Sequence, residues 1–178
     1  MSDSLEYALQ CMRDMQRAQQ GAWSYCSFYD YVLDRGHAGR VEQLTGEEWN
    51  IASGVPGVYP RPQGCFHNAQ RVVLKDRSQQ LVYVEGFAVC GFLPMHHGWI
   101  EINGKVLDPT WSRDLCIPAE GSSYFGVEFS RGEIKAARET RKKKVLWSII
   151  DNWEAGWPEM KKPRLTPLPP SILPKEIG

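Results

Sequence analysis

The stretch His97-Gly-Trp-Ile-Glu-Ile-Asn-Gly-Lys-Val-Leu-Asp-Pro-Thr110 decides the fold prediction, because it encodes a β-hairpin. Asn103-Gly104 is the dipeptide best suited to a two-residue type I′ turn, and a strand-like run flanks it on each side. With that turn, His97 and Asp108 become diagonal neighbours on one face of the hairpin. Pro109 has no N–H to donate, so strand pairing should end just past Asp108. The stretch therefore predicts a short antiparallel hairpin that carries an imidazole beside a carboxylate.

Strand parity separates two adjacent histidines at the start of this hairpin. His97 shares its face with Asp108, whereas the side chain of His96 points to the opposite face. A bulged turn would shift the register by one residue and exchange the two roles. We therefore expect His97, rather than His96, to meet the carboxylate.

A cysteine precedes the hairpin at a position that suits a nucleophile. The segment 54–64 contains three prolines and three glycines, which predicts a shaped loop. Cys65 follows this loop and opens a predicted helix, where free N–H groups and the positive end of the helix dipole favour a thiolate. His67 faces away from Cys65 on that helix, and His37 lies in a polar loop region with no carboxylate partner recognisable from spacing.

Other patterns predict an α+β domain over residues 1–157, with N-terminal helices and a cysteine-bearing helix packed on an antiparallel sheet. Leu81–Cys90 is apolar on both faces except at Glu85 and predicts a buried central strand, in which Gly86 suggests a bulge or a close approach. Helices are expected at Ser4–Gln20, Gly21–Leu33, Gly46–Ala52 and Arg131–Trp153. Residues 158–178 form a proline-rich tail, either docked or loose.

Composition excludes several classes of protein. The 21 basic and 21 acidic residues cancel, so no global field attracts nucleic acid or anionic lipid, and we expect neither a nucleic-acid nor a membrane partner. The N-terminus lacks the basic start and apolar core of a secretory signal, and the five cysteines include no CxxC pair, which favours reduced thiols and a cytoplasmic location. Cys65, Cys90, His96, His97 and Cys116 lack the spacing of zinc ligands, so we expect no metal site and no cofactor.

Three blocks in this order resemble the catalytic blocks of the transglutaminase-like and papain-like cysteine enzymes. They are Gly64-Cys-Phe-His-Asn-Ala69, Tyr83-Val-Glu-Gly-Phe-Ala88 and the hairpin His97–Thr110, together about a quarter of the chain with the residues between them. The resemblance implies that Cys65 is the nucleophile, His97 the general base and acid, and Asp108 the carboxylate that orients His97. Gly98 replaces the usual alanine, the hairpin is very short, and no acidic cluster typical of a calcium site is visible.

Four further residues are candidates for stabilising an oxyanion or positioning a substrate: Gln63, Asn68, Trp99 and Glu85. Together with the triad they predict attack of a thiolate on an amide carbon of a protein, a peptide or a small amide, through a thioester. Hydrolysis is preferred over acyl transfer because nothing in the sequence specifies an amine pocket. The alternative is a non-catalytic protein that uses the same fold to bind a protein or nucleic acid, with the tail as a possible protein-binding segment.

Overall fold

In the part of the chain that the computed structural model describes, residues 2–16, 24–55, 63–89, 93–111 and 121–167, five α-helices surround a five-stranded sheet. This confirms the expected α+β class. The helices are α1 (Ser2–Gln16), α2 (Phe28–Arg35), α3 (Gly46–Ser53), α4 (Cys65–Lys75) and α5 (Arg131–Glu139). The strands are β1 (His37–Gly39), β2 (Val82–Val89), β3 (Met95–Ile102), β4 (Lys105–Leu107) and β5 (Ser123–Phe129).

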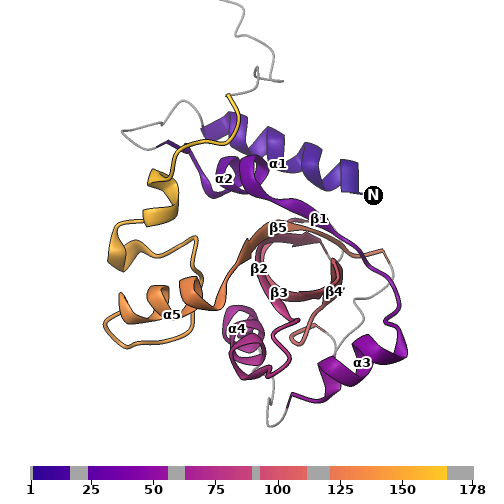
Figure 1. Ribbon diagram of the computed structural model, residues 1–178. Coiled ribbons are helices and arrows are strands. Elements are labelled where there is room, and N and C mark those ends of the chain that lie inside the picture. Colours follow the sequence, from indigo (N-terminus) through magenta and orange to yellow (C-terminus); the bar gives the residue numbers. More distant parts are fainter. Residues whose placement is uncertain (1, 17–23, 56–62, 90–92, 112–120, 168–178) are drawn as a thin grey trace, which may run out of the picture.

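The sheet has the order β1-β5-β2-β3-β4, with antiparallel pairing throughout. It curls until its two edge strands meet, as the ring of strands in Figure 1 shows. The backbone of Arg40 closes the curl, since its N–H donates to the carbonyl of Gly104 (3.0 Å) and its carbonyl accepts from the N–H of Val106 (2.9 Å). Closure leaves few strand edges exposed. The expected central strand is confirmed, because β2 lies in the middle of the order and is buried along most of its length.

The hairpin of β3 and β4 has the predicted register. Ile102 pairs with Lys105 and Ile100 with Leu107, so Asn103-Gly104 is a two-residue turn. Both turn residues have positive φ, 51° and 74°, as a type I′ turn requires. Pairing ends at Leu107, one residue before Asp108, in agreement with the effect expected of Pro109.

The inside of the curled sheet is a small core of its own. Val84, Ala88, Trp99, Val106 and Tyr124 form a buried cluster there, separate from the larger core beneath the helices. Trp99 needs a glycine opposite, because a Cβ on Gly126 would lie 2.4 Å from its ring. The close approach expected at Gly86 is also present, with a Cβ position 2.3 Å from the carbonyl oxygen of Phe125, but the register on both sides is continuous and contains no bulge.

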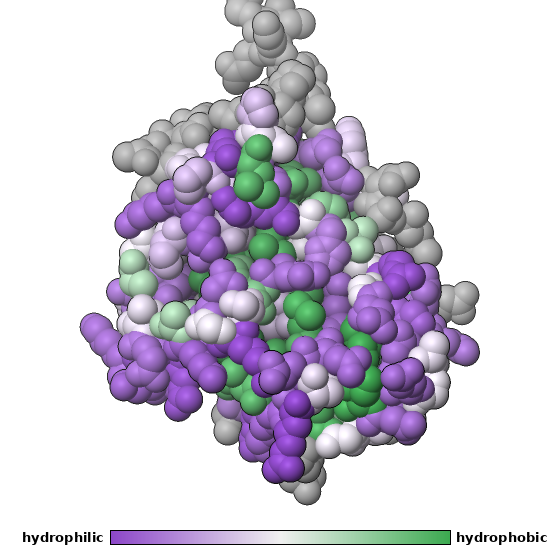
Figure 2. Space-filling model, in the orientation of Figure 1, coloured by the Kyte–Doolittle hydropathy of each residue, from purple (hydrophilic) through white to green (hydrophobic). Residues whose placement is uncertain are grey.

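The helices cover the outside of the curled sheet with amphipathic faces. In Figure 1, α4 lies along β3, and α1 and α2 lie on the β5 side. Helix α4 buries an apolar stripe that includes Ala69, Val72 and Val73 against the sheet. On the face shown in Figure 2, hydrophilic residues cover most of the surface, and hydrophobic ones form a narrow band down the middle.

Two of the predicted helices have different bounds. Helix α2 begins at Phe28 rather than near Gly21, because the Ser27 side chain caps it by accepting from the N–H of Asp30 (3.2 Å). The single helix expected over Arg131–Trp153 is wrong, since α5 ends at Glu139 and an irregular segment follows. The helices at the N-terminus and at Gly46–Ala52 are confirmed, although residues 17–23 lie outside the described part.

Part of the proline-rich tail is docked. The short 3₁₀ helix η3 (Pro158–Lys161) buries Met160 completely, and Glu159 accepts a hydrogen bond from the hydroxyl of Tyr31 on α2. Further along, Arg164 forms an ion pair with buried Asp30 at 2.7 Å. The tail therefore contacts α2 as far as Thr166, whose N–H donates to Asp34 at 2.8 Å, and residues 168–178 lie outside the described part. Among the described helices, none combines the length and the apolar character needed to cross a membrane.

Candidate active site

Cys65 is the first residue of α4, as expected. The N-cap residue is Gly64, which has no side chain to cap the helix, so the N–H groups of the first turn keep their capacity to donate. Cys65 is half-buried and forms no disulfide, and the same is true of Cys11 and Cys26. Most of the loop expected at 54–64 lies outside the described residues, and so do Cys90 and Cys116. The thiol thus lies at the positive end of a helix.

His97 and Asp108 form a buried pair. The Nε2 atom of His97 lies 2.7 Å from Oδ2 of Asp108, and both side chains are almost inaccessible to solvent. The carboxylate also accepts from the hydroxyl of Tyr124 (3.0 Å) and from the backbone N–H groups of Thr110 (2.9 Å) and Trp111 (3.1 Å). Burial opposes ionisation of Asp108, but these hydrogen bonds, with His97 foremost, hold its pKa below the usual value. Asp108 is therefore an ionised carboxylate with all its acceptor sites in use.

The imidazole of His97 connects the carboxylate to the thiol. Burial alone would lower the pKa of His97, but hydrogen bonds with Asp108 and with the Cys65 side chain, together with their charges, raise it to about 9. Since Nε2 faces Asp108, Nδ1 is the ring nitrogen left for the thiol. The three residues predicted from the sequence thus lie together, and His97 is poised to carry a positive charge at neutral pH.

Aromatic and polar neighbours hold the imidazole in place. The indole of Trp111 stacks on the His97 ring, with centroids 4.1 Å apart and an interplanar angle of 19°. Asn68, one turn along α4 from Cys65, donates from its side chain to the hydroxyl of Thr110 at 2.9 Å. This bond ties the cysteine-bearing helix to the segment that follows Asp108. Asn68 is therefore engaged with Thr110, which makes it a positioning residue in this arrangement.

Glu85 belongs to a separate network. Its buried carboxylate accepts from the hydroxyl of Tyr83 (2.8 Å), from the hydroxyl of Ser148 and from the backbone N–H groups of Ile149 (2.7 Å) and Ile150 (3.2 Å). His96 lies 3.0 Å away, on the face opposite to His97 as strand parity predicted. These contacts tie the irregular segment that follows α5 to strand β2.

The two remaining candidates, Gln63 and Trp99, lie in different surroundings. Gln63 is exposed, has positive φ (59°) and lies two residues before Cys65. Trp99 is fully buried inside the curled sheet, where its indole N–H donates to Glu101 at 3.0 Å, so it belongs to the core rather than to a cleft wall. Tyr124 was missed from the sequence, since nothing in the alternation of β5 indicates that its hydroxyl reaches Asp108.

A basic hollow of about 780 Å³ lies beside the start of α4. Gln63 and Gly64 contribute to its wall, and Trp147 provides a half-exposed aromatic surface. The cationic side chains in its lining are Arg71, Arg138 and Lys144, and no acidic residue lines it among the described residues. The hollow therefore suits a group that is apolar and carries negative charge.

Comparisons of the chain with protein-family models, with curated proteins and with solved structures found no match. The candidate site therefore depends on its own geometry.

Proposed function

We propose that this chain is a cysteine-nucleophile enzyme that cleaves an amide or a related acyl bond. The observation that carries the proposal is the buried bond between His97 and Asp108 at 2.7 Å, on an imidazole whose pKa the Cys65 side chain at the start of α4 also raises. Such an arrangement supports a thiolate paired with an imidazolium, which is the reactive form of a cysteine nucleophile.

The chemistry follows from the position of each group. The Cys65 thiolate attacks the acyl carbon, and the first-turn N–H groups of α4 stabilise the oxyanion that forms. His97 then donates its proton to the leaving amine, which departs and leaves a thioester on Cys65. Water attacks the thioester while His97 accepts a proton, and a carboxylic acid is released. Asp108 fixes the ring orientation and supports the imidazolium throughout.

The resemblance to transglutaminase-like and papain-like enzymes supports the same assignment. In those enzymes the cysteine opens a helix packed on an antiparallel sheet, and the histidine and the aspartate come from successive strands. The order of α4, β3 and β4 agrees with that plan. Hydrolysis remains preferred over transfer to an amine. The basic hollow includes Gly64, the residue before Cys65, and favours a substrate that carries negative charge.

Thiol reactivity tests the first part of this proposal. In a short treatment with iodoacetamide at pH 7, we expect Cys65 to be alkylated about ten-fold faster than the other cysteines, because an ordinary thiol is only a few per cent ionised at that pH. His97→Ala should abolish this preference, whereas His96→Ala should retain it. Peptide mapping by mass spectrometry gives the rate at each cysteine. Equal labelling of all five cysteines would contradict a thiolate at Cys65.

Acylation tests the second part. p-Nitrophenyl acetate should give a burst of nitrophenolate equal to the enzyme concentration and an acetyl group on Cys65, detectable by mass spectrometry. Cys65→Ser should lose at least about 10³-fold in rate. A reactive Cys65 that is never acylated, or whose acyl group never turns over, would favour the non-catalytic binding protein.

A further inference from the structure

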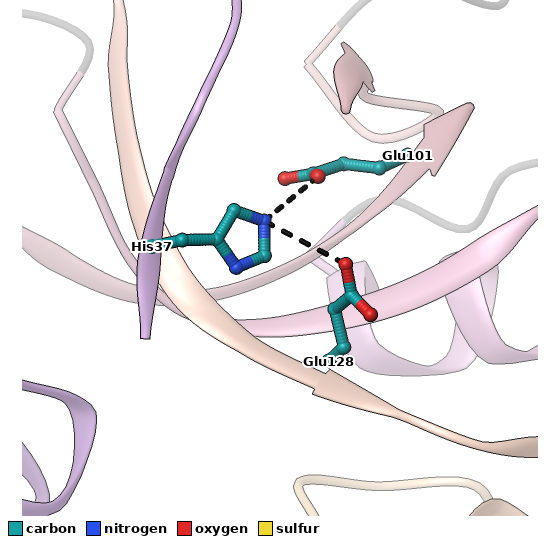
Figure 3. A group of neighbouring side chains, drawn as sticks. All are labelled: His37, Glu101 and Glu128. Atoms are coloured by element: carbon teal, nitrogen blue, oxygen red, sulfur yellow. Dashed lines mark hydrogen bonds and ion pairs between the residues drawn. The ribbon is translucent and has the colours of Figure 1, made fainter. Parts of the chain in front are cut away.

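A second group of ionisable side chains lies on the inward face of the curled sheet. His37 comes from β1, Glu101 from β3 and Glu128 from β5, and Figure 3 shows the three side chains pointing toward one another. The Nε2 atom of His37 lies 2.9 Å from Oε2 of Glu101 and 3.9 Å from Oε1 of Glu128. One nitrogen and two carboxylate oxygens lie within 4.8 Å of one another.

The Glu101 carboxylate is buried and held in a fixed position within this group. The residue is 1% exposed, and its second oxygen, Oε1, accepts the indole N–H of Trp99 at 3.0 Å. Gly39 on β1 makes space for this carboxylate, because a Cβ at that position would lie 2.9 Å from Oε1 of Glu101. A donor that fixes one oxygen and leaves the other directed at a shared point is typical of metal-ligating carboxylates.

The charge of the group favours a cation. With a neutral imidazole, two carboxylates face one another, one of them buried, and an uncompensated buried carboxylate is costly. In the described part of the chain, Glu101 is paired with Nε2 of His37 at 2.9 Å. A single proton on that nitrogen would balance only part of the charge of the two carboxylates, whereas a divalent ion at the same point would balance all of it.

We propose that His37, Glu101 and Glu128 bind a divalent transition-metal ion of the zinc type. The imidazole favours such an ion over calcium or magnesium, which prefer oxygen ligands only. Binding forms bonds from the metal to Nε2, Oε2 and Oε1 and releases the Nε2 proton to solvent, and water completes the coordination. His37 and Glu128 are partly exposed, at 41% and 59%, so the ion can enter from solvent.

This site is distinct from the proposed catalytic residues. His97 and Glu101 are four residues apart on the same face of β3, about 13 Å along the strand, and Trp99 lies between them. An ion held by β1, β3 and β5 joins three strands of the curled sheet, including the three-residue strand β1. Its expected effect is to stabilise the fold, independently of whether Cys65 is a nucleophile.

Cobalt and zinc binding test the proposal on the full chain carrying Cys65→Ser, which removes the candidate nucleophile as a competing ligand. We expect one equivalent of Zn²⁺ by calorimetry, proton release, and a rise in Tm. Co²⁺ should give a spectrum of nitrogen and oxygen ligation without a thiolate charge-transfer band. His37→Gln and Glu101→Gln should weaken Zn²⁺ binding at least ten-fold, and Glu128→Gln should weaken it measurably.

Controls keep the test decisive. His67→Gln and the exposed Glu47→Gln should leave Zn²⁺ affinity unchanged. Glu101→Gln keeps an oxygen for Trp99, and exposed Glu128 can be replaced with little risk to folding, so circular dichroism should show native variants. Three results would each overturn the site. They are the absence of stoichiometric Zn²⁺ binding, a thiolate band with Co²⁺, and an unchanged Zn²⁺ affinity in both folded single variants, Glu128→Gln and His37→Gln.

Discussion

At the scale of single residues, two opposing effects determine the charge of the His97 imidazole in the candidate triad. Burial favours the neutral ring of His97, whereas the Asp108 carboxylate and the Cys65 side chain favour the charged ring, and their combined effect wins. The carboxylate can exert this effect because four donors keep it ionised inside the protein. Asp108 is thus the residue on which the charge state of His97 depends.

The charge of His97 predicts a titration. In wild-type protein, the imidazole should titrate near pH 9, and in Asp108→Asn its pKa should fall, because the asparagine hydrogen-bonds but carries no charge. The ring resonances of His97 in NMR spectra report the midpoint directly. Asp108→Asn should also reduce acylation of Cys65 by about 10²–10⁴-fold. Tyr124→Phe, which removes one neutral donor to Asp108, serves as the milder comparison. An unchanged midpoint in Asp108→Asn would contradict the pair.

The same titration predicts how stability varies with pH. The pKa of His97 is higher in the folded state, about 9, than the ordinary value of 6.5, so the folded state binds more protons between these values. The contribution of His97 to the free energy of unfolding is therefore complete below pH 6.5 and is lost as the pH rises to about 9. Denaturant unfolding of wild type and of His97→Gln at several pH values measures it. A difference between the two proteins that grows with rising pH would refute the assignment.

At the scale of elements, the hairpin was predictable because its geometry is local. Asn103-Gly104 determines the turn, the turn determines the register, and the register places His97 and Asp108 on one face. Helix α4 was predictable for the same reason, from its apolar stripe and the loop before it. The helix expected beyond Glu139 is wrong, and its last residues instead meet distant Glu85, which accepts from the N–H groups of Ile149 and Ile150. No local pattern reports such a long-range contact.

The turn itself carries a prediction. Gly104→Ala should destabilise the protein by about 1–2 kcal/mol, because alanine must adopt the left-handed conformation that Gly104 occupies at φ 74°. It should also slow alkylation of Cys65, since the register of Asp108 depends on this turn. Gly132→Ala, in the first turn of α5 where only a Ser130 side-chain atom lies nearby, should leave the protein as stable or slightly more so. Thermal melts and urea titrations compare the two, and equal effects would exclude a special role for the turn.

At the scale of the whole molecule, the curl of the sheet decides which side chains meet. Residues on one face of β3 reach partners on β4, β5 and β1 because the strands close into a ring (Figure 1). The sequence predicted the His97–Asp108 pair, which needs one hairpin, but missed Tyr124 and the pairing of His37 with Glu101, which need closure. His37 was assigned to a polar loop and instead lies in β1, a strand too short to recognise from its pattern.

Glu85 is the residue through which the sheet holds the C-terminal segment. Its carboxylate is fully buried on the outer side of β2 and accepts hydrogen bonds from two backbone N–H groups and the hydroxyl of Ser148. Burial disfavours its charge, but His96 and these donors hold its pKa below the usual value. One side chain thus anchors the segment 148–150 to the sheet.

Removal of this carboxylate should loosen that segment before it affects the hairpin. Glu85→Ala leaves several buried donors without an acceptor, so we expect a loss of about 3–5 kcal/mol in the free energy of unfolding. Glu85→Gln, which retains one acceptor oxygen, should lose less, and exposed Glu42→Ala should lose almost nothing. Hydrogen exchange should accelerate at the amides of Ile149 and Ile150 more than at those of β3. Unchanged protection of these two amides in Glu85→Ala would mean that the segment is held by its apolar contacts alone.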